Sequence, residues 1–237
     1  MDVTAADPEV FAREAADPYC LTDEQVDVLL AGSPWTRFVV VGDSIAEGLG
    51  DPTEGYRPLP WADRTARALE RQRPGDFTFL NLGRRDLVTA EVRRTQLAPA
   101  VEFRPDLALV IAGGNDILRP VFDNGEQVQA DFDALVVGLQ EAGAEVLTCT
   151  MFDITRSPIV PAEYKAQLGE RLGDLAGRLQ AVAAERGTLH VDFHTHPAAA
   201  EAGIYSTDVR HCNHRGHAIA AAGAVRRLGE RLGHRLD

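Results

Sequence analysis

The sequence predicts an α/β protein built on a parallel sheet. Five short apolar segments have the pattern of buried strands, and helical segments of ten or more residues lie between them. The expected strands lie at 38–41, 77–82, 106–112, 145–151 and 189–193. The expected helices lie at 61–72, 87–98, 127–141, 162–186 and 215–232. Apolar strands that alternate with helices indicate that helices cover both faces of the sheet, and the crossovers between the strands should be right-handed.

The length and composition favour one large domain with an appended N-terminal segment. A chain of 237 residues with 45% apolar and 25% charged residues can bury one large core. We place this domain at 35–237. Residues 1–34 are rich in Asp, Glu and Ala, and Thr22 with Gln25 forms a capping-box pattern before the apolar face of Val26, Leu29 and Leu30. This pattern predicts a short helix that packs on the domain.

The charge balance and the cysteines exclude several functional classes. The 24 basic and 36 acidic residues give a net charge of −12, which argues against a nucleic-acid partner. No segment has the length of a membrane span, and the N-terminus lacks a signal-peptide pattern, so we expect a cytoplasmic protein. Three widely spaced cysteines, Cys20, Cys149 and Cys212, indicate neither a disulfide framework nor a zinc site.

Ser44 follows the first expected strand directly after Gly42 and Asp43. A serine at this place has two uses, because its hydroxyl can cap the next helix or stand exposed as a nucleophile. On spacing alone the cap is the commoner of the two. The choice depends on whether other segments supply a base, an orienting acid and donors for an oxyanion.

Polar residues follow other strands at what should be the same edge of the sheet. Asn115 comes after the third strand, and Asp208 with His211 lies in the loop after the fifth. Ligands of open parallel sheets bind at the carboxyl ends of the strands. An acid, an imidazole and a serine at this edge can form a Ser/His/Asp site, with the Asn115 amide as an oxyanion donor. The alternatives are a turn at Asn115, a helix cap at Asp208 and a surface position for His211.

Two further chemistries compete with a serine nucleophile. Cys212 beside His211 suggests a thiol nucleophile, but adjacent side chains point apart on most backbones. A metal site is suggested by two groups of histidines, which are His211, His214 and His217, and His190, His194 and His196 around Asp192. The HExxH signature of zinc hydrolases is absent from the sequence, so a serine site is favoured.

Taken together, the motifs resemble the SGNH hydrolases, also called GDSL-type esterases or lipases. Gly42-Asp43-Ser44 is similar to the first sequence block of that family. Gly113 to Asp116 is similar to the third, and Asp208 to His211 followed by His217 is similar to the last. The resemblance implies a three-layer, flavodoxin-like α/β/α sandwich around a five-stranded parallel sheet. It also implies that Ser44 is the nucleophile, His211 the base, Asp208 its orienting acid, and Asn115 an oxyanion donor.

The second block departs from the family pattern. Members often have an Asn followed five residues later by a Gly whose backbone N–H completes the oxyanion hole, whereas here Asn81 is followed by Asp86. Gly83 lies in another register. We expect the backbone N–H groups of Asp86 and Ser44 to act with Asn115, provided that the φ of Asp86 is negative. The Asp86 carboxylate should point away or pair with Arg84, Arg85 or Arg119, because its charge opposes an oxyanion.

These expectations describe a cofactor-free and metal-free serine hydrolase that cleaves an ester of a small molecule, carbohydrate or lipid. An acyltransferase or deacetylase acting on a small metabolite with the same residues is one alternative. A non-catalytic binding protein that keeps the fold is another, and Asp86 is the feature that favours it. The loops at 48–60, 152–161 and 197–207 should form the substrate walls, with Phe152, Ile154, Ile159 and Tyr205 making the pocket partly apolar.

Overall fold

The sheet holds five parallel strands in the order β2-β1-β3-β4-β5 in the computed structural model, which describes residues 8–119 and 124–236. The strands are β1 (Arg37–Gly42), β2 (Thr78–Asn81), β3 (Leu107–Ile111), β4 (Glu145–Cys149) and β5 (Leu189–Val191). This order is that of flavodoxin-like doubly wound sheets, and it places a topological switch point between β1 and β3. The predicted fold class is therefore confirmed.

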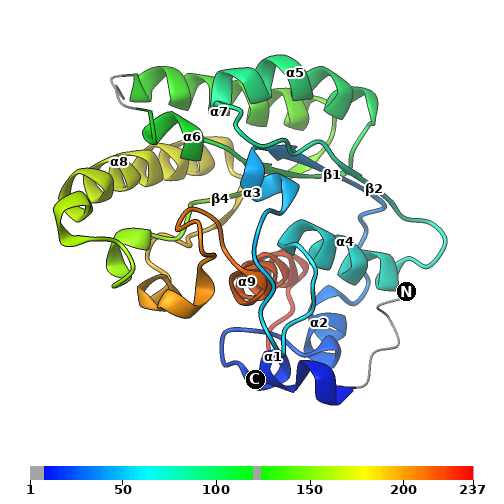
Figure 1. Cartoon of the computed structure of the whole chain (residues 1–237). Helices are drawn as coiled ribbons and strands as arrows, with labels where there is room; N and C mark the ends of the chain where they lie inside the picture. The colour runs from blue at the N-terminus through cyan, green and yellow to red at the C-terminus, as the bar shows by residue number, and fades with distance from the viewer. Residues whose placement is uncertain (1–7, 120–123, 237) are drawn as a thin grey trace.

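Helices cover both faces of the sheet (Figure 1). The α-helices are α1 (Ala12–Ala16), α2 (Asp23–Leu30), α3 (Ser44–Glu47), α4 (Trp61–Gln72), α5 (Thr89–Glu102), α6 (Gly114–Ile117), α7 (Gly125–Glu141), α8 (Ala162–Arg186) and α9 (His214–Leu232). Short 3₁₀ helices occupy Pro8–Phe11, Ile154–Arg156, Pro197–Ala200 and Ala202–Ile204. Helices α4 and α9 lie on one face with α2 outside them, and α5, α7 and α8 lie on the other.

Alternating strand residues divide the core into two apolar layers. In β1, Phe38 and Val40 pack with α4 and α9, whereas Val39 and Val41 pack with α5 and α7. All four side chains are fully buried. A run of apolar residues without alternation is what a strand covered on both faces requires, and β1 and β3 show such runs in the sequence.

Most predicted boundaries agree with the structure to within a few residues, and α5 is the main exception. The sequence predicts a helix over 87–98, which would end directly before Pro99. The helix continues to Glu102. The N–H groups of Phe103 and Arg104 close its last turn on the carbonyls of Pro99 and Val101 at 3.1 and 2.9 Å.

The N-terminal segment contacts α4 and α9. The capping box of α2 is confirmed, with both hydrogen bonds between Thr22 and Gln25 present. Glu14, which is almost fully buried, pairs with Arg64 of α4 at 2.8 Å. Asp17 accepts from Arg215 in the first turn of α9 and from the Tyr56 hydroxyl, each at 2.7 Å. Ion pairs therefore join this segment to the helix that follows the loop of His211.

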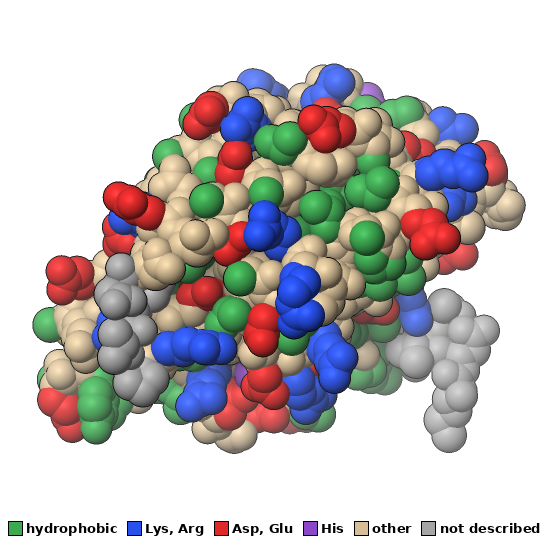
Figure 2. Space-filling model, turned by 90° about the horizontal axis from the view of Figure 1, so that it is seen from above, with side chains coloured by type: hydrophobic (Ala, Val, Ile, Leu, Met, Phe, Trp, Pro, Cys, Tyr) green, Lys and Arg blue, Asp and Glu red, His purple; other side chains and the backbone are tan. Residues whose placement is uncertain are grey.

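On the face shown in Figure 2, charges of both signs are interspersed, with apolar side chains between them. Among the described residues, no helix has the length and apolar character needed to cross a membrane.

Candidate active site

The end of β1 exposes Ser44 through a tight turn. A Cβ atom at Gly42 would lie 2.0 Å from the carbonyl oxygen of Ile111, so only glycine allows β1 to pass so close to β3. The Asp43 side chain accepts from the N–H of Ile45 at 3.0 Å and thereby caps α3. Because Asp43 is the cap, Ser44 is the first helical residue and its hydroxyl is available for another partner.

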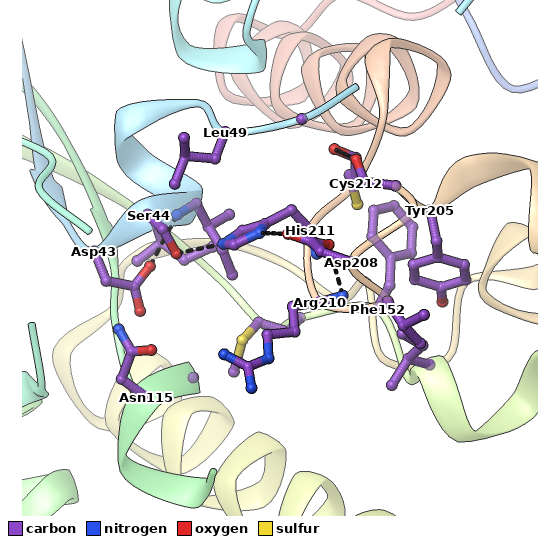
Figure 3. A pocket seen from close by; sticks show the side chains of 18 of the residues that line it. Asp43, Ser44, Leu49, Asn115, Phe152, Tyr205, Asp208, Arg210, His211 and Cys212 are labelled. Atoms are coloured by element: carbon purple, nitrogen blue, oxygen red, sulfur yellow. Dashed lines mark hydrogen bonds and ion pairs between the residues drawn. The ribbon is translucent and has the colours of Figure 1, made fainter. Parts of the chain in front are cut away.

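That partner is His211 (Figure 3). The Ser44 Oγ lies 2.7 Å from His211 Nε2, and His211 Nδ1 lies 2.5 Å from Asp208 Oδ2. The three side chains form one hydrogen-bonded chain across the carboxyl edge of the sheet. The structure thus brings together the serine, imidazole and carboxylate that the sequence singled out.

Asp208 also holds the backbone of its own loop. Its Oδ1 accepts from the N–H groups of Arg210 and His211 at 2.9 and 3.1 Å. Burial acts to raise the pKa of Asp208, but the hydrogen bonds from the His211 ring and from these two N–H groups lower it below the ordinary value. The helix cap is instead Asn213, which accepts from the first N–H groups of α9. Asp208 therefore does not cap this helix.

A second loop fixes the segment that carries His211. Asp51 accepts from the N–H and hydroxyl of Thr207 at 2.8 and 2.7 Å, and its own N–H donates to Ser206 Oγ at 2.8 Å. The Asp51 carbonyl accepts from the N–H of His214 at 3.0 Å. No local pattern in the sequence indicates this contact, because the two loops lie far apart in the chain.

Asn115 reaches the same edge from the start of α6. Its Nδ2 donates to the carbonyl of Leu87 at 2.9 Å, which uses one of the two hydrogens of the amide. Figure 3 shows the side chain directed toward Asp43 and Ser44. The backbone N–H of Ser44 is another donor at this edge. It is one of the first N–H groups of α3, and these have no acceptor within the helix.

The second block folds with a left-handed residue at Asp86, whose φ is +68°. The condition of a negative φ is therefore not met, and this conformation explains why glycine is favoured at such a position. Aspartate is among the few other residues that adopt it readily. No protein acceptor is found for the Asp86 N–H within the described residues. The exposed carboxylate forms no ion pair with a described arginine, since Arg85 binds Glu47 at 3.0 Å.

Asn81 and Gly83 have a different task in this block. The Asn81 amide donates to the Ala46 carbonyl and accepts from the N–H of Gly83, each at 2.8 Å. A Cβ atom at Gly83 would lie 2.3 Å from the N atom of Glu47. Both residues therefore pack the loop against α3, the helix that begins with Ser44.

The model of the GDSL-like lipase/acylhydrolase family matches residues 40–219. The chain belongs to this family. The match includes the first, third and last blocks, and membership makes the chain an ester hydrolase.

Solved structures agree on the fold. TesA is 21% identical with a TM-score of 0.64, covering 81% of this chain and 97% of that one. A lipase/acylhydrolase from Enterococcus faecalis is 19% identical with a TM-score of 0.63, covering 85% and 100%. Axe2, an acetylxylan esterase from Geobacillus stearothermophilus, is 19% identical with a TM-score of 0.65, covering 84% and 95%. No curated protein sequence matches this chain.

The competing chemistries find little support in this GDSL-type chain. Burial raises the pKa of the Cys212 thiol to about 12, so a thiolate is scarce at neutral pH. His217 is buried, and both of its ring nitrogens have partners. Its Nδ1 accepts a hydrogen bond from the N–H of Trp61, and its Nε2 lies 3.0 Å from the carbonyl oxygen of Leu49. Among the described residues, no group of three or more His, Cys, Asp or Glu side chains is placed to hold a metal ion.

Asp43 is a site residue whose environment the sequence did not reveal. Burial raises the pKa of its carboxyl to about 7, although the hydrogen bond from the Ile45 N–H acts in the opposite direction. Gln96 of α5 supports the preceding peptide, exchanging hydrogen bonds of 2.8 and 2.9 Å with the N–H and carbonyl of Gly42. The Gly-Asp-Ser motif marks the position of Asp43 but not its burial.

The site opens into a cavity of about 520 Å³. Phe152, Ile154 and Tyr205 line it as expected, whereas Ile159 packs against the core and is not among the described residues that line the cavity. Further apolar residues of the wall come from α6 and its C-cap, from α8 and from the loop after β4. These residues are Ile117, Leu118, Met151, Leu168 and Leu172. The volume can hold a substrate well beyond the size of an acetyl ester.

Proposed function

We propose that the protein is a serine esterase in which Ser44 is the nucleophile, His211 the general base and Asp208 the residue that orients the imidazole. The observation that supports this most strongly is the pair of hydrogen bonds from Asp208 through His211 to Ser44, at 2.5 and 2.7 Å. A serine becomes nucleophilic when a base within hydrogen-bonding distance can take its proton. The role of Asp43 as the cap of α3 adds support, because it leaves the Ser44 hydroxyl for chemistry.

The reaction proceeds through an acyl-enzyme. His211 Nε2 takes the proton of Ser44, and Oγ bonds to the ester carbonyl carbon while the carbonyl electron pair moves to its oxygen. Collapse of this intermediate breaks the bond to the alcohol oxygen, which leaves with the proton from His211. His211 then takes a proton from water, and the resulting hydroxide attacks the acyl group. The second collapse releases the acid, and the proton returns to Ser44.

The developing oxyanion would be held by the N–H groups of Ser44 and Asp86 and by the free hydrogen of the Asn115 amide. Support comes from their common position around the cavity, from the start of α3, and from the absence of a protein acceptor for the Asp86 N–H in the described chain. Loss of one such donor typically lowers kcat by about 10²- to 10³-fold.

The test is the Ser44→Ala variant with p-nitrophenyl butyrate. We expect turnover to fall at least about 10³-fold while the unfolding transition is preserved, because one hydroxyl is removed and nothing in the core changes. Ser33→Ala is the matched control, since Ser33 is also buried and its hydroxyl has no partner among the described residues. Retained activity in Ser44→Ala would overturn the assignment.

We also propose that the protein works in the cytoplasm. All three cysteines are unpaired, and such thiols are typical of a reducing compartment. Cell fractionation tests this, and recovery of the native protein from the culture medium would contradict it.

A further inference from the structure

Arg210 carries a guanidinium into the cavity beside His211. Figure 3 shows the side chain extending from the loop below His211 toward the space between His211 and Asn115. No carboxylate, carbonyl or hydroxyl in the described parts of the chain accepts a hydrogen bond from it. An unpaired cation thus faces the place where an ester bound to Ser44 would lie.

The backbone of Arg210 is fixed by the same carboxylate that orients His211. Its N–H donates to Asp208 Oδ1 at 2.9 Å. The preceding residue, Val209, has a φ of +58°, a left-handed conformation that β-branched residues rarely adopt. This turn allows the N–H groups of both Arg210 and His211 to reach Asp208. The base of the Arg210 side chain is therefore held in a defined place relative to the serine.

Nearby carboxylates are engaged with other partners. Asp208 binds His211, Asp51 binds Thr207, and Glu47 binds Arg85. Two carboxyl groups that line the cavity remain. Asp86 is exposed and forms no ion pair with a described residue, and Asp43 is buried beside α3. Neither is within ion-pair distance of Arg210, so the guanidinium stays available to a ligand.

The Arg210 side chain is exposed, so a ligand that enters the cavity can reach its guanidinium. A hydrogen bond between two charged groups is shorter and stronger than one between neutral groups. The planar guanidinium matches the two oxygens of a carboxylate or phosphate. We propose that Arg210 is a specificity-determining residue that binds a carboxylate or phosphate group of the substrate, so that the preferred substrates are anionic esters. The inference rests on the proposed esterase function of the same site.

The experiment compares anionic and neutral esters in matched pairs. On the acyl side, mono-p-nitrophenyl glutarate is compared with p-nitrophenyl hexanoate. On the alcohol side, 4-(butyryloxy)benzoate is compared with its methyl ester. The enzymes are the wild type, Arg210→Gln, Arg210→Lys, and Arg119→Gln as a control that removes an exposed charge outside the described cavity lining.

We expect Arg210→Gln to lower kcat/KM about tenfold or more for the anionic member of one pair, mainly through KM, and less than about twofold for the neutral esters. Arg210→Lys should retain a large part of the preference, and Arg119→Gln should behave as the wild type. The affected pair identifies the part of the substrate that carries the charge. Equal losses on charged and neutral esters, or no loss on either anionic ester, would overturn the proposal while leaving the esterase intact. If the wild type cleaved none of the four esters, the esterase function would be overturned, and this inference with it.

Discussion

The hydroxyl of Ser44 owes its availability to its neighbour. Asp43 satisfies the first turn of α3, so Ser44 can donate toward His211 instead of capping the helix. The sequence left these two uses open, because a strand end followed by Ser fits both. The contact with His211, which lies far along the chain, distinguishes a nucleophile from a helix cap. Local sequence patterns can therefore suggest the role of Ser44 but cannot decide it.

Asp43 provides the first prediction. Because the pKa of its buried carboxyl is raised to about 7, the folded protein binds a proton that the unfolded chain releases between about pH 4 and pH 7. Stability contributed by this group therefore falls as the pH rises through that window. Asp43→Asn keeps the oxygen that caps α3 and removes the charge. We expect it to raise the free energy of unfolding by about 1–3 kcal/mol at pH 8 and by much less at pH 4.

Urea titrations of both proteins at the two pH values measure this difference. An equal effect at pH 4 and pH 8 would show that Asp43 does not titrate as described.

Asp86 provides the second prediction. Its left-handed φ is readily adopted by asparagine, so Asp86→Asn should preserve the backbone and the N–H while removing a charge near the oxyanion. A unit charge about 5 Å from an oxyanion in solvated surroundings would oppose it by roughly 1 kcal/mol. We expect kcat for a neutral aryl ester to rise about threefold with the melting temperature unchanged. A fall in kcat would mean that the carboxylate assists the reaction.

At the scale of elements, long periodic segments were predictable and short ones were not. The predicted ranges of α4 and α8 match the structure, because each presents a regular apolar face to the core. Helices α3 and α6 are single turns whose existence depends on Asp43 and Gly113 at the ends of β1 and β3. They have no periodic signal, yet they carry Ser44 and Asn115.

The N-terminal segment adds a contact that reaches the site indirectly. Asp17 is buried against Arg215, which lies in the first turn of α9 just after the loop of His211. Hydrogen bonds from Arg215, Tyr56 and Tyr19 lower the pKa of Asp17, although burial acts to raise it. A lowered pKa means that its stabilisation is present above about pH 4 and is lost as the pH falls through the folded value.

We therefore expect Asp17→Asn to destabilise the protein by about 3 kcal/mol at pH 7 and by less at pH 3. Chemical denaturation at both pH values measures this. Arg94→Gln, which changes an exposed residue of α5, is the control. A wild-type unfolding midpoint in Asp17→Asn at pH 7 would contradict a bracing role for this segment.

At the scale of the whole molecule, the fold was more accessible to sequence reasoning than the finer features of the site. The order of strands and polar residues placed Ser44, Asn115 and His211 at one edge, because parallel strands present their carboxyl ends together. The orientation of Arg210 and the hydrogen bonds from Thr207 to Asp51 depend on loop conformations, which leave no periodic pattern in the sequence. The sequence therefore predicts the residues of the Ser/His/Asp site, but it does not predict the loop conformations that shape the substrate cavity.

The central claim is that folding alone assembles a reactive serine from distant segments. Labelling with a fluorophosphonate, followed by peptide mass spectrometry, tests it most directly in the native protein, in urea-unfolded protein and in folded His211→Gln. We predict modification at Ser44 in the native protein, with little or none in the other two samples, because the hydroxyl needs His211 to become nucleophilic. An unlabelled Ser44 in the native protein, or equal labelling in His211→Gln, would contradict the account.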